Sequence, residues 1–226
     1  MSKDHYISYS QVSLALACPL LYFEMYAIKR REELSPATPP MLRGTKEHKL
    51  HEDVMKGVLS KNQGATRAIN PSSFGKTFKL LKDVGVPLLS EGKISVPYND
   101  KYGLVLVADV ISEGYEQTAD VYLADFKSGR QRETDFNQLD FYCYILMREF
   151  PKIKSIRQNI IGIGEFYHPP ERVYTRKTFK EKSPEVEHTL SYVIDLLEDK
   201  LPHEPVENFR CASCLLSTCA NYVEDK

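Results

Sequence analysis

The sequence predicts an α/β fold, in which helices flank a mixed β-sheet and a cysteine-bearing tail closes the chain. Runs of β-forming residues fall between residues 93 and 168 and are separated by turn-forming residues. On either side of this region, apolar residues recur at the three- and four-residue spacing of amphipathic helices. With 226 residues, the chain can form one sizeable domain with a small appendage.

The composition is that of an ordinary globular protein, with 42% hydrophobic residues, 27% charged residues and a formal net charge of −1. The N-terminus lacks the uninterrupted apolar core of a signal peptide, and no stretch is long enough to span a membrane. We therefore expect a cytoplasmic protein with no membrane partner. The net charge neither supports nor excludes a nucleic-acid partner.

The N-terminal third predicts mainly helices. Residues 8–28 are expected to be helical, with Ser8 or Ser10 as the N-cap. Pro19 is expected to break this region into two helices, because proline is tolerated at a helix start but not in a helix interior. The pattern that follows predicts a loop at 35–40, a helix at 43–59, a loop at 60–75 and a short helix at 76–85.

The middle of the chain predicts strands. Residues 93–97 and 103–112 flank the turn-forming stretch YNDKYG and are expected to form an antiparallel hairpin. Further strands are expected at 120–128 and 159–168, with a helix at about 135–150 between them. A final helix is expected to begin at Ser183-Pro184, with an apolar face made of Val186, Leu190, Val193, Leu197 and Leu201.

Cysteines lie at both ends of the chain, as Cys18 in a Cys-Pro step and as Cys211-x2-Cys214-x4-Cys219. A C-x2-C pair places two thiolates within reach of one metal centre, and a third follows one short turn later. Cys18 is the natural fourth ligand, so we expect a metal or cluster to tie the two chain ends together. In a reducing compartment such a set indicates ligands rather than disulfides. Cys143, in the run FYCYIL, is expected to be a buried free cysteine.

Two acidic residues in neighbouring strands predict a cation site. Asp125 and Lys127 are two residues apart in a strand, so they share a face while Phe126 points into the core. By themselves they indicate only an ion pair. Asp109 lies in the apolar run LVLVADVI, where a carboxylate is costly unless it is paired or binds a metal. If the two strands pair, Asp109 and Asp125 can converge on a divalent cation such as Mg²⁺ or Mn²⁺.

Other polar residues accompany these acids. His48 ends the motif R-G-x3-H, although a lone helical histidine is more often structural, and His51 and Glu52 compete with it for a role in the site. Gln138 and Tyr142 are spaced i, i+4 and share a helix face. Ordinary packing of Tyr142 and solvation of Gln138 are the alternative interpretation.

The motifs occur in a fixed order: G-x3-H, an acid at Glu91, an acid in the second strand, D-F-K-S-G and Q-x3-Y. This order resembles the RecB-like branch of the PD-(D/E)XK nuclease superfamily. With the cysteines added, the chain resembles the iron–sulfur subset that includes the CRISPR-associated RecB-like exonucleases and the AddB nuclease domain. The resemblance implies a restriction-endonuclease-like mixed sheet within a single nuclease domain, residues 1–226. Its core would cover about 41–200, and an iron–sulfur subdomain would join about 8–35 to 201–226.

The resemblance also implies roles for single residues. His48, Asp109 and Asp125 would hold the metal together with the backbone carbonyl of Phe126, and Lys127 would orient or activate the attacking water. The remaining motif residues would organise the site and contact substrate, namely Glu91, Gln138 and Tyr142.

The four cysteines would bind a [4Fe–4S] cluster, and Zn²⁺ is the alternative for four thiolates. Arg130 and Arg132 are candidate phosphate contacts, with a solvated loop as an equally supported alternative. Two positions depart from the family pattern: Leu106 replaces a frequent glycine, and Glu47 stands at a usually apolar position.

The expected activity is that of a Mg²⁺- or Mn²⁺-dependent DNA exonuclease. Single-stranded DNA or DNA with free ends is the expected partner, in recombination, repair or CRISPR-type processing. Partner proteins of a DNA-processing complex are compatible with this interpretation. The alternative is a catalytically idle DNA-binding or adaptor protein that retains the fold, although the intact Asp109, Asp125 and Lys127 argue against it.

Overall fold

The protein is described by a computed structural model that defines residues 5–35, 38–129, 135–208, 211, 214–217 and 219. The chain folds as two compact units. The first, the sheet unit, comprises Met1–Tyr6 and Pro39–Lys182. The second, the terminal unit, comprises Ile7–Thr38 and Ser183–Lys226.

The sheet is mixed, as the sequence predicts. Its strand order is β1-β3-β4-β5-β6, and β2 pairs with β3 outside this path. The pair β4–β5 is parallel, whereas β2–β3, β3–β4 and β5–β6 are antiparallel. The strands are β1 (His5–Ile7), β2 (Leu88–Pro97), β3 (Tyr102–Ser112), β4 (Asp120–Lys127), β5 (Ser155–Gly162) and β6 (Arg172–Thr175).

The expected hairpin is present and is longer than predicted, because β2 begins at Leu88 rather than at residue 93. Its register runs from Leu88 opposite Ser112 to Pro97 opposite Gly103. At the turn, the side-chain carbonyl of Asn99 accepts hydrogen bonds from the backbone N–H groups of Lys101 and Tyr102. These bonds stabilise the turn locally.

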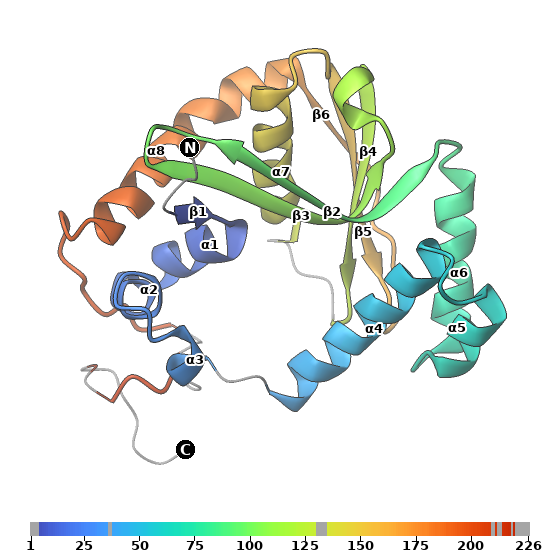
Figure 1. Cartoon of the computed structure of the whole chain (residues 1–226), viewed down its shortest axis with the longest axis horizontal. Helices are drawn as coiled ribbons and strands as arrows, with labels where there is room; N and C mark the ends of the chain where they lie inside the picture. The colour runs from blue at the N-terminus through green and yellow to red at the C-terminus, as the bar shows by residue number, and fades with distance from the viewer. Residues whose placement is uncertain are drawn as a thin grey trace. The chain divides into compact units, whose positions relative to one another are not determined.

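Helices cover both faces of the sheet. The helices that include residues of the sheet unit are α4 (Pro39–Met55), α5 (Lys61–Arg67), α6 (Pro71–Asp83), α7 (Asp135–Glu149) and α8 (Arg176–Leu197). On one face of β4, Ala124 and Phe126 pack against Leu81 of α6. On the opposite face, Asp125 meets Gln138 of α7. Figure 1 shows α5 and α6 to one side of β4 and β5, and α7 to the other.

The prediction of a loop at 60–75 is wrong, because α5 and the start of α6 lie there. Ser60 and Gln63 form a reciprocal capping box that starts α5. The Asn70 side chain accepts a hydrogen bond from the Ser73 N–H, and Pro71 occupies the first turn of α6. Both caps involve residues only three positions apart in the sequence. They can therefore start helices in this stretch, although its polar composition is typical of a loop.

Other boundaries also differ from the prediction. The strand expected at 159–168 is β5, which starts at Ser155 and ends at Gly162, and β6 was not expected. Helix α8 starts at Arg176, so Pro184 lies inside it rather than at its start. The buried residues of α8 lie beyond this proline and are Leu190, Val193, Ile194 and Leu196. Their packing stabilises the helix despite the hydrogen bond that proline removes.

The terminal unit contains α1 (Tyr9–Ala17), α2 (Pro19–Tyr26) and α3 (Arg31–Leu34). The predicted break at Pro19 is confirmed: Cys18 is extended between α1 and α2, and Pro19 opens the second helix. Ser8 occupies the N-cap position of α1. Within the described residues, no helix combines the length and the apolar character needed to cross a membrane.

The side chain of Arg176 caps the C-terminal end of α7. Its guanidinium donates to three backbone carbonyl oxygens, of Ile153 at 2.5 Å, Met147 at 2.6 Å and Phe150 at 2.7 Å. The last carbonyls of a helix have no partner within the helix, so a fork of charged donors satisfies groups that would otherwise be left unpaired.

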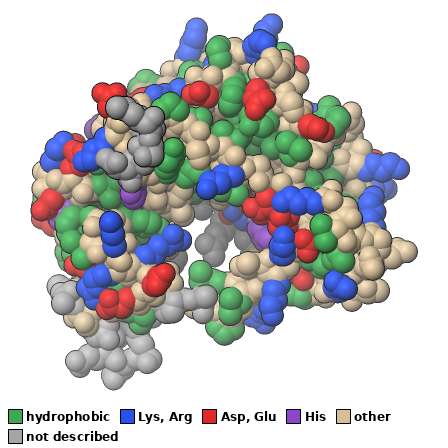
Figure 2. Space-filling model, viewed as in Figure 1, with side chains coloured by type: hydrophobic (Ala, Val, Ile, Leu, Met, Phe, Trp, Pro, Cys, Tyr) green, Lys and Arg blue, Asp and Glu red, His purple; other side chains and the backbone are tan. Residues whose placement is uncertain are grey.

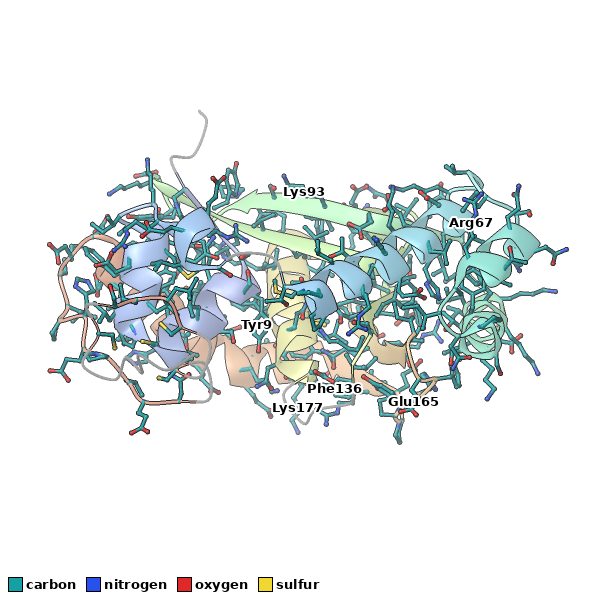
Figure 3. All side chains as sticks on the ribbon, turned by 90° about the horizontal axis from the view of Figure 1, so that it is seen from below. Tyr9, Arg67, Lys93, Phe136, Glu165 and Lys177 are labelled. Carbon is teal, nitrogen blue, oxygen red and sulfur yellow. The ribbon has the colours of Figure 1, made fainter. Side chains whose placement is uncertain are left out.

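Arg176→Ala is therefore expected to lower the free energy of unfolding by about 2 kcal/mol, measured by urea denaturation. Arg176→Lys should restore little of this loss, because one ammonium group does not reproduce the planar fork. Lys177→Ala is the control, since that side chain is 85% exposed and projects from the surface (Figure 3). Equal stability of Arg176→Ala and the wild type would contradict the role of the fork.

Candidate active site

The centre of the candidate site is the buried carboxylate of Asp125, which is 4% exposed. Its Oδ2 atom lies 2.6 Å from Nζ of Lys127, and its Oδ1 atom accepts a hydrogen bond of 2.9 Å from Nε2 of Gln138. Lys127 also donates to Oε1 of Gln138 at 3.0 Å. Asp125 and Lys127 therefore share a face of β4, as predicted, and that face meets α7.

Gln138 and Tyr142 lie together on α7. Nε2 of Gln138 donates to the Tyr142 hydroxyl at 2.8 Å. Tyr142 is buried, and burial is the largest cause of the raised pKa of its phenol. Gln138 is hence not a solvated residue, because its amide connects Asp125, Lys127 and Tyr142.

A second group of polar side chains lies on the next strand. Asp109 of β3 accepts a hydrogen bond from the backbone N–H of Phe126 at 2.6 Å through Oδ2. Its Oδ1 atom lies 3.2 Å from Nδ1 of His48 on α4. In the β3–β4 register, Val110 stands opposite Ala124, so Asp109 and Asp125 occupy facing positions. The structure thus brings His48, Asp109, Asp125 and Lys127 to one part of the sheet.

The charges of these groups influence one another. Burial, and next the charge of Asp109, raise the pKa of Asp125 to about 6, although the ion pair with Lys127 opposes the increase. Burial acts to lower the pKa of His48, but its hydrogen bond with Asp109 and the charges of both aspartates outweigh that effect, so the pKa is raised. The buried Asp125 carboxylate is therefore stabilised in its charged form by a cation beside it, as by Lys127.

Glu91 lies opposite Asp109 at the single interruption of the β2–β3 register, between the pairs Ser90–Val110 and Gly92–Ala108. Its φ of 55° is in the left-handed region, which side chains other than glycine rarely adopt. Burial, and then the charges of Asp109 and Glu52, raise the pKa of Glu91. A strained backbone at an acid beside two other acids is an arrangement that is typical of functional sites.

The neighbouring part of α4 carries a network of charged side chains. Lys49 pairs with Glu52 and Asp53, and Lys56 pairs with Glu52. Figure 2 shows acidic and basic side chains interspersed along this helix. These ion pairs are partly solvated, so we assign them to the surface of α4 and not to the chemistry.

His51 and Glu47 lie behind the site instead of in it. His51 is fully buried, and its ring lies 4.7 Å from that of Phe74 and 5.2 Å from that of Phe126. Its Nδ1 atom is 2.8 Å from the backbone oxygen of Glu47. The Glu47 carboxylate is buried too and accepts a hydrogen bond from the Ile69 N–H, which explains an acid at a position expected to be apolar.

The donor set that the sequence resemblance implies would suit a hard divalent cation, since it would consist of carboxylate oxygens, an imidazole and the backbone carbonyl of Phe126. Asp125 Oδ2 is buried and lies 2.6 Å from Nζ of Lys127, so both oxygens of Asp125 have a polar partner. Both oxygens of Asp109 are already engaged. Accordingly, no three His, Cys, Asp or Glu side chains of the described segments are arranged to hold a metal ion as they stand.

Two solved structures resemble this chain over most of its length. A crystal structure from Eubacterium rectale, named "Putative exonuclease", has a TM-score of 0.57 at 10% identity and covers 91% of this chain and 86% of its own. The crystal structure of SSO0001 has a TM-score of 0.52 at 13% identity and covers 99% of this chain and 90% of its own. The chain shares its fold with both. No protein-family model matches the sequence, and no curated protein matches it.

The four cysteines all belong to the terminal unit. Cys18 is buried between α1 and α2, and no disulfide joins the described cysteines. Nδ2 of Asn208 donates to the backbone oxygen of Ala17 at 2.9 Å, and Cys211 N–H donates to the backbone oxygen of Asn208 at 3.0 Å. The segment before Cys211 is therefore attached next to Cys18.

The other residues that the sequence singles out are Cys143, Arg130, Arg132 and Leu106. Cys143 is fully buried on α7 and its thiol accepts a hydrogen bond from Gln158, as expected for a structural cysteine. Arg130 and Arg132 lie outside the described residues. Leu106 is buried in β3.

The raised pKa of Asp125 predicts a pH dependence of stability in metal-free protein. In the unfolded chain this carboxyl loses its proton near pH 3.8, whereas in the folded chain it retains the proton up to about pH 6. The free energy of unfolding of the wild type should therefore fall, relative to Asp125→Asn, as the pH rises from about 4 to about 6. Chemical denaturation in EDTA across this range measures the difference, and parallel pH profiles would refute the assignment.

Proposed function

We propose that the chain is a metal-dependent deoxyribonuclease that acts on DNA ends. The observation that carries this proposal is the buried Asp125 carboxylate, paired with Lys127 and placed opposite Asp109 on the neighbouring strand. Buried acids with raised pKa values beside a specific charged partner are frequent in catalytic sites. The fold shared with a structure named "Putative exonuclease" supports the same conclusion.

We propose that His48, Asp109 and Asp125, with the carbonyl of Phe126, hold Mg²⁺ or Mn²⁺. A hard cation removes the repulsion between the two carboxylates and suits their oxygens. When bound, it supplies polarisation of the scissile phosphate and acidification of an attacking water. Glu91 adds negative charge next to Asp109, and this charge would strengthen the attraction of the site for a cation. Glu91 need not touch Asp109 for this effect.

Lys127 would act on the nucleophile. Its ammonium lies 2.6 Å from Asp125 and donates to Gln138, and its side chain is still 25% exposed. It can therefore be held in one position and still reach a water or a phosphate oxygen. From there it would orient the attacking water and stabilise negative charge that develops on the phosphate. Gln138 positions Lys127 and Asp125 relative to each other, and Tyr142 holds Gln138.

Exonucleolytic cleavage of single-stranded DNA or of duplexes with free ends is the form of the activity that we propose, in recombination, repair or CRISPR-type processing. The sequence resemblance to RecB-like nucleases supports this choice. The reaction itself requires only a phosphodiester next to the acids and Lys127, so the same site would serve either strand form once the DNA is positioned.

Lys127→Ala is expected to lower the rate of DNA cleavage by about 10² to 10³, because a preorganised positive charge is lost from the transition state. End-labelled single-stranded and double-stranded DNA, incubated with Mg²⁺ or Mn²⁺, gives the rate and the strand preference. Lys93→Ala is the matched control, since this lysine is exposed on β2 and points away from α7 (Figure 3).

Equal cleavage by the wild type and Lys127→Ala would refute the catalytic role of this residue. No cleavage by the wild type under any of these conditions would instead favour the catalytically idle DNA-binding protein or adaptor. Fluorescence anisotropy with the same oligonucleotides then distinguishes a DNA-binding protein from one without affinity for DNA.

We further propose that Cys18, Cys211, Cys214 and Cys219 bind a [4Fe–4S] cluster, with Zn²⁺ as the alternative. The hydrogen bonds of Asn208 support this, because they bring the segment before Cys211 to the residue before Cys18. The backbone N–H of Cys214 donates to the oxygen of Cys211 at 3.3 Å, so these two cysteines lie close together. Such a cluster would have a structural role, since none of its ligands belongs to the sheet unit.

Cys211→Ala is expected to lose most of its bound metal and to melt at a lower temperature, because ligation and folding are coupled in small metal-binding units. Iron and zinc analysis of anaerobically purified protein, together with visible absorption, identifies the metal. Cys143→Ala should retain the metal, because that thiol is engaged in the core by Gln158. Unchanged metal content and melting temperature in Cys211→Ala would refute the proposal.

A further inference from the structure

The part of the chain that forms α5 and α6 is strongly basic. Residues 54–82 contain six lysine and arginine residues and no acid, whereas the whole chain has 30 basic and 31 acidic residues. Figure 2 shows basic side chains over these two helices. The even charge balance of the whole chain therefore hides a local excess of positive charge, which is the kind of pattern that attracts an anionic partner. The six basic residues are Lys56, Lys61, Arg67, Lys76, Lys79 and Lys82.

Three of these lysines lie along one face of α6. Lys76, Lys79 and Lys82 are all exposed. At 3.6 residues per turn they span about 120° of the helix surface and about 9 Å along its axis. The buried side of α6 is centred about 170° away from them, so the lysines point away from the sheet. The residues of that buried side are Ser73, Phe74, Thr77, Phe78 and Leu81.

Neighbouring residues define the two flanks of this face. Helix α5 lies beside α6, and Nζ of Lys61 is 5.7 Å from the centroid of the Phe78 ring (Figure 1). On the other flank, Nζ of Lys76 is 5.5 Å from the centroid of the Phe166 ring. Gly75 lies among the lysines, where an added Cβ atom would meet nothing within 4 Å. We name this open surface, with Lys61, Lys76, Lys79 and Lys82, the α6 basic face.

The charges of the α6 basic face have no counter-charge within the part of the chain that the structure describes. None of its four lysines forms an ion pair there. The one acid of α6 is Asp83, at the last residue of the helix. Residues three positions apart on a helix are neighbours, so Lys79 is close to two like charges that repel it. A bound anion would remove this repulsion.

We propose that the α6 basic face binds the phosphate backbone of double-stranded DNA without reading its sequence. Ammonium groups bind phosphates as point charges, and the face has no Asn, Gln or Arg side chain to contact base edges. The aromatic rings of α6 are buried, so they are not placed to stack on unpaired bases. A duplex carries one charge per about 1.7 Å of its axis, twice the density of a single strand, and is therefore the preferred form.

The chemistry of the face argues against a protein partner. The cores of protein interfaces are depleted in lysine and enriched in aromatic residues, methionine and arginine. No large hydrophobic side chain of α6 is exposed, so the helix offers no apolar anchor. Lysines interspersed with Ser72 and Gly75 form a surface that can approach a charged backbone closely.

The α6 basic face and the candidate active site lie on opposite sides of β4. Leu81 of α6 packs against Ala124 and Phe126, whereas Asp125 meets Gln138 of α7. The face is therefore a second binding place, which goes beyond the proposed function. Only the choice of DNA over RNA rests on that function. In a nuclease, the face would retain the duplex and take no part in the chemistry.

The test measures binding of a labelled DNA duplex by fluorescence anisotropy, with Lys127→Ala as the parent protein to prevent cleavage. Lys76→Gln with Lys79→Gln and Lys82→Gln should weaken binding by at least about tenfold at about 0.1 M salt. The slope of log K against log salt should become shallower by about 3, one unit for each lost phosphate contact. Lys76→Arg with Lys79→Arg and Lys82→Arg should retain the affinity and the slope, because the charges remain.

The matched control is Lys93→Gln with Lys177→Gln and Lys180→Gln, which removes the same charge from exposed positions on β2 and α8. It should bind the duplex within about twofold of the parent, since it leaves the phosphate contacts of α6 in place. An equal loss of affinity in both glutamine variants would show that only net charge matters, and would overturn the site. Unchanged binding in the α6 variant would overturn it as well.

Three other ligands test the choice of partner. A single strand of the same sequence should bind more weakly than the duplex, and tighter binding of the single strand would overturn the duplex preference. An RNA duplex that binds more tightly than the DNA duplex would overturn the choice of DNA. Labelled polyglutamate that binds as tightly as DNA, and loses affinity in the α6 variant, would identify an acidic protein as the partner instead.

The α6 basic face and the nuclease function fail in different ways. In protein that retains Lys127, the α6 glutamine variant should raise KM for duplex ends by about tenfold and leave kcat unchanged, because binding alone is lost. If that protein does not cleave DNA, the proposed function falls, whereas the binding results still decide the inference. If it cleaves DNA and the α6 variant has the KM of the wild type, only the inference about the α6 basic face falls.

Discussion

The burial of the Asp125 carboxylate is the constraint on which the rest of the sheet unit depends. A negative charge 4% exposed must be compensated, and the chain does this with Lys127 on the same strand and Gln138 on α7. The compensation is incomplete, because a second acid, Asp109, stands opposite Asp125 on the neighbouring strand. The remaining electrostatic imbalance raises the pKa of Asp125, and it is the reason why we propose a cation at this place.

Gln138 connects this charge to the packing of the fold. Its amide has one orientation that satisfies its partners, with the nitrogen toward Asp125 and Tyr142 and the oxygen toward Lys127. Reversing the amide would place its oxygen against a carboxylate and its nitrogen against an ammonium. The apolar residues that surround Gln138 on α7 are buried against the sheet. The position of α7 and the geometry of the acids are therefore set by the same contacts.

The sequence predicts the parts of this structure that depend on local periodicity. The face shared by Asp125 and Lys127 follows from strand alternation, and the break at Pro19 follows from proline geometry. The helices within 60–75 were missed because their capping residues, Ser60 with Gln63 and Asn70, lie in a polar stretch without a strong apolar pattern. The pairing of Asp109 with His48 could not be derived from spacing, since 61 residues separate them and only the tertiary fold brings them together.

The left-handed backbone conformation of Glu91 limits which residues are favourable at this position. Glycine would adopt a φ of 55° without steric cost, and asparagine would adopt it more readily than glutamate. A chain shaped only for stability would thus carry one of these residues at the point where β2 faces Asp109. Glu91 therefore links the backbone strain of the hairpin to the negative charge of the site. A variant with glycine at this position would relieve the strain and, at the same time, remove one of the negative charges around Asp109.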